Sequence, residues 1–162
     1  MKKILFIAYN FPPEGGPAVQ RVSKFIKYLH QFDYRVIVLT SNHKYSIVDE
    51  TLLKDIPEDT VVHKSLDYGN YVPGDIRNKF LKNYFVPDKQ VFWKKSALKK
   101  VKEIIRNNDI DVIISTSPPH SAHLIGLEIK KKYNIPLIVD FRDEWTMNPS
   151  FADFHNKSKN RD

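Results

Sequence analysis

Apolar residues gather in short runs that predict buried strands. The runs are rich in β-branched residues and mostly lack the alternation of a half-exposed strand, which is typical of parallel strands covered on both faces. Four runs are clear: Ile4 to Ala8, Val36 to Thr40, Val112 to Ser115 and Leu137 to Phe141. Val61 to Lys64 is a weaker fifth.

Between these runs, apolar residues recur at the spacing of a helix, and we interpret each apolar stripe as core. Pro17 suits the first turn of the first predicted helix, and Asn134 and Pro136 end the third. The stripes are Val19, Val22, Phe25, Ile26 and Leu29; Ala97, Leu98, Val101, Ile104 and Ile105; and Ala122, Ile125, Ile129 and Tyr133.

Strands that alternate with helices predict an α/β fold, Rossmann-like and doubly wound, with a mainly parallel sheet and helices on both faces. We expect one domain over residues 1–153 and a polar tail over residues 154–162. The stretch from Ser41 to Trp93 is the least regular. It predicts an extended crossover with one short strand and a short helix near Ile76 to Asn83.

The amino-acid composition excludes several classes of function. The chain has no cysteine, which excludes a disulfide framework, a thiol nucleophile and a thiolate metal site. No apolar run approaches the roughly 18 residues of a membrane-spanning helix. The start "MKKILFIA" resembles a signal peptide, but Tyr9, Asn10 and Pro12 interrupt it, so we interpret it as the first strand. We expect a cytoplasmic protein.

The net charge of +7 is concentrated between Arg77 and Arg106, which contain ten basic and two acidic residues. Such a cluster could contact an anionic bilayer, a phosphorylated substrate or nucleic acid. The alternative is a solvated helix face in a lysine-rich protein. Because no nucleic-acid motif is present, we expect no nucleic-acid partner.

Ligands of doubly wound sheets bind beyond the carboxyl ends of the strands, and the first such loop holds Gly15 and Gly16 in "YNFPPEGGPAVQR". Glycine permits positive φ and close approach of backbone to ligand, and the helix after Pro17 offers free N–H groups. This geometry suits a phosphate or carboxylate, and an ordinary tight turn is the alternative. Neither G-x-G-x-x-G nor a P-loop is present.

The second loop, "STSPPHSAHL", contains Ser117 and His120. A histidine at a helix N-terminus is held toward neutrality by the helix dipole and could hydrogen-bond a substrate. A structural histidine is the alternative. A zinc site built on His120 and His123 would need further ligands at suitable spacing, and we expect no metal.

The third loop, "VDFRDEWTMNP", places Asp140, Asp143 and Glu144 around Arg142. A carboxylate here could accept a proton from a hydroxyl, and Arg142 could lower its pKa or bind phosphate. An internal ion-pair network is the alternative. We favour a functional role for Asp143 and a structural one for Asp140.

Together the three loops resemble a known family. "FPPEGGPAVQRVSKFIKYLHQFDYRVIVLT" resembles the opening of family 4 glycosyltransferases of the GT-B fold. "STSPPHSAHLIG" and "VDFRDEW" are similar to later loops of the branch that builds bacterial surface polysaccharides. The resemblance covers nearly the whole chain in the expected order.

The resemblance implies the N-terminal, acceptor-side domain of an enzyme that transfers a sugar from a nucleotide-sugar to a glycan or lipid-linked acceptor. Gly15 and Gly16 would close over the sugar and donor diphosphate, with Arg21 nearby. Ser117, His120 and Arg142, which the loops themselves suggest, are the further candidates for contact with substrate. Asp143 stands nearest to the place where many relatives carry a sugar-contacting histidine, which makes it the catalytic candidate. The family generally retains anomeric configuration and needs no metal or other cofactor.

Relatives of this family are usually more than twice as long, and a second domain binds the nucleotide-sugar. We therefore expect little transfer by this chain alone and a possible separate donor-binding chain as partner. The basic stretch would hold the protein peripherally at the inner face of the cell membrane. The alternative function is a non-catalytic module that binds a sugar or anion, or docks a partner.

Overall fold

The computed structural model describes residues 1–72 and 87–143. The short helix expected over residues 76–83, the first part of the basic stretch, Glu144 and the domain boundary after residue 153 lie outside the described residues. Among the residues described, no helix is long and apolar enough to cross a membrane.

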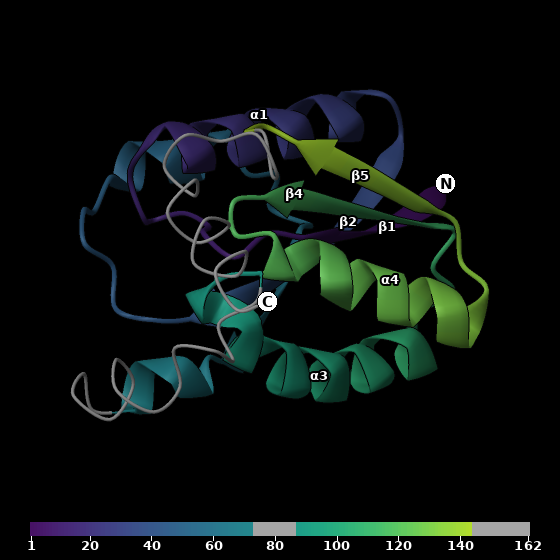
Figure 1. The fold of residues 1–162 in the computed structure, drawn as a ribbon. Helices are drawn as coiled ribbons and strands as arrows, with labels where there is room; N and C mark the ends of the chain where they lie inside the picture. The colour runs from purple at the N-terminus through teal and green to yellow at the C-terminus, as the bar shows by residue number, and fades with distance from the viewer. Residues whose placement is uncertain (73–86, 144–162) are drawn as a thin grey trace.

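A five-stranded sheet forms the centre of the fold, and all five predicted strands are confirmed (Figure 1). Each pair of neighbouring strands is parallel, and the strand order is β3-β2-β1-β4-β5. The predicted bounds differ from the observed ones by two residues at most, as expected where strand ends depend on hydrogen bonds to a neighbour. The strands are β1 (Lys2–Ile7), β2 (Tyr34–Asn42), β3 (Val61–Leu66), β4 (Val112–Ser117) and β5 (Leu137–Phe141).

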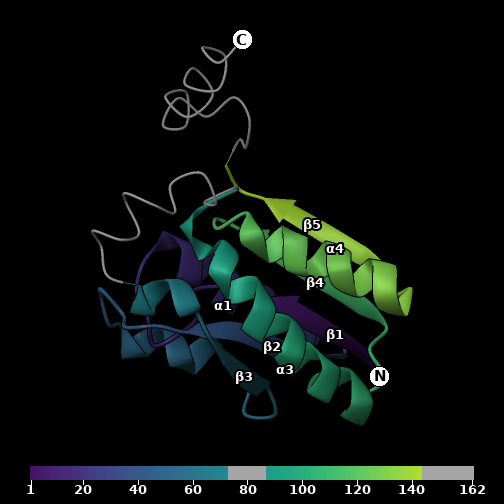
Figure 2. The same cartoon turned by 60° about the horizontal axis from the view of Figure 1, so that its bottom comes forward.

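Among residues 1–72 and 87–143, three α-helices cover the two faces of the sheet, as the apolar stripes predict. They are α1 (Pro17–Gln31), α3 (Trp93–Asn107) and α4 (Ser121–Tyr133). One core cluster joins Leu5, Ile7 and the inner faces of α3 and α4, and the other joins Phe6 and Val38 to α1. Figure 2 shows α3 and α4 side by side across one face of the sheet. The doubly wound α/β fold is therefore confirmed.

One residue of the predicted stripes is exposed, and one residue outside them is buried. Phe25, which belongs to the first apolar stripe, is 38% exposed and lies under the guanidinium of Arg21 rather than in the core. Trp93, at the start of α3, is completely buried, and its indole N–H donates to Ser65 Oγ at 2.8 Å. A buried indole needs such a partner, which only the folded chain brings to it.

Candidate functional site

The carboxyl ends of β1 and β4 lie next to each other at the centre of the sheet. From β1 the chain continues outward to β2 and β3, and from β4 it continues outward to β5 in the other direction. The gap between the ends of β1 and β4 is therefore the topological switch point, where doubly wound folds bind ligands. A small pocket is present there. It is lined by Ala8, Tyr9, Asn10, Ala18, Val22, Thr116, Pro118 and Arg142.

The glycine pair lies directly before α1, whose first turn reaches the pocket. Gly16 is the N-cap of α1 with φ 121° and ψ 165°, and Gly15 N donates to Ile47 O at 3.0 Å. Ala18, in the first turn of α1, lines the pocket. The partially positive N-terminus of this helix is therefore next to the pocket, where it favours a negatively charged group.

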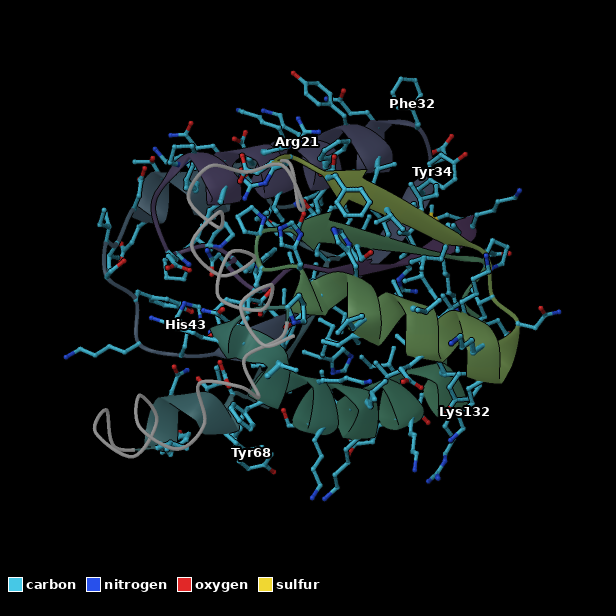
Figure 3. The ribbon with its side chains drawn as sticks, viewed as in Figure 1. Arg21, Phe32, Tyr34, His43, Tyr68 and Lys132 are labelled. Atoms are coloured by element: carbon cyan, nitrogen blue, oxygen red, sulfur yellow. The ribbon has the colours of Figure 1, made fainter. Side chains whose placement is uncertain are left out.

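Arg21 lies one turn into α1 (Figure 3). It is paired with Asp140 of β5. Its Nη2 and Nε donate to the two carboxylate oxygens at 2.7 and 3.2 Å, and Thr116 Oγ1 donates to the same carboxylate at 2.8 Å. Burial alone would raise the pKa of Asp140, but the hydrogen bonds from Arg21 and Thr116 outweigh it and lower that pKa. The ion-pair network considered for this loop is thus present at Asp140.

Arg142 reaches the pocket from the end of β5. Its Nε donates to the backbone carbonyl of Ser117 at 2.6 Å, which fixes the plane of the guanidinium beside the pocket. Its positive charge also contributes to the lowered pKa of Asp140. A guanidinium carries five N–H donors, and one bond to a carbonyl leaves most of them for an anion.

The histidines of the second loop lie on the opposite face of the sheet. His120 and His123 are 2% and 5% exposed, and Phe141 packs against both rings. Burial lowers the pKa of His120, and nearby Asp88 and Asp143 oppose that change. Desolvation is therefore the largest cause of the lowered pKa of His120.

His123 is the more strongly perturbed of the two histidines. Its Nδ1 is 2.9 Å from Ser115 Oγ, and burial, reinforced by His120, lowers its pKa to about 4. Within residues 1–72 and 87–143, neither His123 Nε2 nor Ser117 Oγ has a hydrogen-bond partner, although both are buried. In the same part of the chain, no three His, Asp or Glu side chains gather as a metal site would require.

The sheet divides the predicted residues into two groups. Thr116 pairs with Asp140 and faces α1, whereas Ser115 contacts α4 and Phe141 packs on its histidines. Arg21 and Arg142 therefore belong to the pocket side, and His120 belongs to the α4 side. Asp143 is exposed and close enough to His120 to influence its pKa.

Sequence reasoning missed one polar cluster near the glycine pair. His43, on the connection after β2, lies with Nε2 3.1 Å from Glu14 Oε2, and its Nδ1 contacts Ser41 Oγ (Figure 3). A search of every loop at the carboxyl end of a strand, including the loop after the second strand, would have found His43. Glu14, the acidic residue directly before the glycine pair, was the other indication of this cluster in the sequence.

No family model and no curated protein matches this chain, but its fold resembles solved structures. The C-terminal domain of a hydrogenase from Pyrococcus furiosus is 22% identical, with a TM-score of 0.52; the match covers 86% of this chain and 90% of that one. UGT2 of Phytolacca americana, complexed with UDP-2fluoro-glucose and pterostilbene, is 13% identical, with a TM-score of 0.53 over 100% of this chain. A ugt transferase from Siraitia grosvenorii in complex with UDP is 12% identical, with a TM-score of 0.51 over 86% of this chain.

At these identities the likeness establishes the fold alone. The chain spans 34% of the Phytolacca structure and 27% of the Siraitia structure. The predicted Rossmann-like α/β fold is confirmed, and both the glycosyltransferases and the hydrogenase domain share it. The finer resemblance, to family 4 and its bacterial branch, stays a prediction.

Proposed function

We propose that this chain is the acceptor-side half of a GT-B glycosyltransferase that moves a sugar from a nucleotide-sugar donor to a glycan or lipid-linked acceptor. The observation that carries the proposal is the pocket at the switch point, bounded by the N-terminus of α1 and by Arg142. Both groups favour a phosphate. Because unrelated functions share this fold, the site and not the fold is the basis of the proposal.

Residues in and around the pocket each have a part in this proposal. Gly16, which has no side chain, lets the backbone approach the sugar and diphosphate. Arg142 binds phosphate oxygens, and Asp140 holds Arg21 at the edge of the site. Asp143 is the proposed proton acceptor for the acceptor hydroxyl as its oxygen attacks the sugar and the bond to the diphosphate breaks. The donor enters as a co-substrate, and we assign no metal or other cofactor.

The proposed cellular role is synthesis of surface polysaccharide at the cytoplasmic face of the membrane. The described part of the basic stretch supports membrane contact, because Lys95, Lys99, Lys102 and Arg106 are all exposed and recur at the spacing of one helix face on α3. Sedimentation with liposomes tests this role. Binding should require anionic lipid and fall as salt is raised, and binding indifferent to both would contradict it.

Titration of the ¹⁵N-labelled protein tests the pocket directly. Pyrophosphate and UDP should shift the amide resonances of Gly16 and Ala18, whereas uridine, which has no phosphate, should not. Arg142→Ala should weaken pyrophosphate binding about tenfold or more, since a hydrogen bond to a charged group contributes roughly 1.5–3 kcal/mol. Arg35→Ala is the matched control, because Arg35 is exposed near the opposite end of the sheet.

Two results would contradict the proposal. One is the absence of resonance shifts at millimolar pyrophosphate and UDP. The other is equal binding by the Arg142→Ala and Arg35→Ala variants, which would show that the anion contacts the protein through its general positive charge rather than through the pocket.

A further inference from the structure

The glycine loop is held by a second segment of the chain, residues 43–49, which follows β2. Gly15 N donates to Ile47 O at 3.0 Å, and Asp49 N donates to Pro13 O at 2.8 Å. Between these two bonds, Glu14 and Val48 form an antiparallel bridge. The loop before α1 is therefore one side of a short two-stranded contact, rather than a turn supported only by its own residues.

One buried side-chain contact, between Glu14 and His43, reinforces this arrangement. Glu14 Oε2 lies 3.1 Å from His43 Nε2, and the two side chains are only 9% and 12% exposed. The other ring nitrogen of His43 contacts Ser41 Oγ at the end of β2. Because both nitrogens are engaged, His43 has none left for a substrate. Removing either partner would leave the other buried without its partner, which is costly.

The same histidine also supports a wall of the pocket. Its ring stacks on Tyr9 with centroids 4.8 Å apart and planes 21° apart, and Tyr9 lines the pocket. The hydroxyl of Tyr9 is fixed from the other side, because it donates to Asp67 at 2.7 Å. His43 is thus in contact both with the residue before the glycine pair and with the pocket itself.

We propose that residues 43–49, through the Glu14–His43 pair, clamp the Gly15–Gly16 loop in the shape that presents the N-terminus of α1 to a phosphate-bearing ligand. Glu14 and His43 are positioning residues: they act through the loop and through Tyr9. The ligand class rests on the proposed function, whereas the clamp itself rests on the contacts above. A clamped loop binds without the entropic cost of ordering a mobile one.

Amide hydrogen exchange measures the clamp without any ligand. In Glu14→Gln and His43→Ala, exchange at Gly15 N–H and Asp49 N–H should quicken at least tenfold, while amides of the central strands keep their protection. His43→Gln, whose amide nitrogen can replace the Nε2 contact with Glu14, should recover part of the protection. His30→Ala is the matched control, because His30 pairs with Asp59 at 3.5 Å in an exposed position.

Pyrophosphate affinity then tests the positioning role. The Glu14→Gln and His43→Ala variants should bind at least tenfold more weakly, and His30→Ala should bind like the wild type. Unchanged exchange at Gly15 and Asp49 in the folded variants would overturn the clamp. Faster exchange with unchanged pyrophosphate affinity would overturn its positioning role. If the wild type itself does not bind pyrophosphate, the proposed function fails, and exchange at these two amides still decides the clamp.

Discussion

The backbone of Gly16 offers the most direct test of how the loop is built. Its φ of 121° and ψ of 165° lie in a region that is essentially restricted to glycine. A Cβ added to Gly16 would meet nothing within 4 Å, so Gly16→Ala changes the backbone energy without a steric clash. Gly15 is the complementary case: its φ is not in the positive range, but an added Cβ would lie 3.0 Å from Ile47 Cγ2.

The expected magnitude follows from these two observations. A non-glycine residue in this region costs about 1–3 kcal/mol. Alanine also restricts the unfolded chain, which raises the free energy of unfolding by about 0.4–1 kcal/mol and offsets part of this cost. We therefore expect Gly16→Ala to lower the free energy of unfolding by about 1.5 kcal/mol. Gly15→Ala should cost less, because Ile47 is 63% exposed and its side chain can move aside.

Urea unfolding followed by far-UV circular dichroism provides the assay, and Ile47→Ala provides the control. Removing Ile47 Cγ2 should rescue Gly15→Ala in the double variant but leave the loss in Gly16→Ala unchanged. A Gly16→Ala variant within 0.5 kcal/mol of the wild type would refute the reasoning. Rescue of Gly16→Ala by Ile47→Ala would refute it too, because the cost would then come from packing.

Three further predictions concern other contacts of the site. Asp88→Ala should lower the free energy of unfolding by about 2 kcal/mol in urea, because the carboxylate caps α4 through both Ser121 N and Ser121 Oγ. The pKa of His123 is about 4 in the folded protein and returns to its ordinary value on unfolding. The free energy of unfolding should therefore be greatest above that ordinary value and fall by about 3 kcal/mol as the pH drops toward 4. His123→Asn should flatten that pH profile in the same urea titrations. A double-mutant cycle of Arg21→Ala and Asp140→Asn should give a coupling energy of about 1 kcal/mol, and a value near zero would show that the pair is only a surface contact.

The sequence alone determined the strands, the α-helices of the described residues and the class of fold, but not the short 3-10 helices between Asn42 and Trp93. Five apolar runs and three helical stripes are local patterns, because burial on a strand or helix repeats at a fixed spacing along the chain. Asn134 ends α4 in the left-handed conformation, as its sequence position predicts. The positive φ of Gly16 could also be predicted from the sequence, because a glycine between a strand and a helix indicates a special backbone conformation.

Only the tertiary structure decided which polar residues meet. Asp140 joins Arg21 across 119 residues of sequence, and this contact depends on β5 pairing with β4 and on α1 covering that face. His43 meets Glu14 only because β1 and β2 are neighbours. The pKa of His123 falls because the fold excludes water from it, which no local pattern records. Strand order and burial are properties of the whole packed chain, so residue type and spacing identified candidates but could not assign their partners.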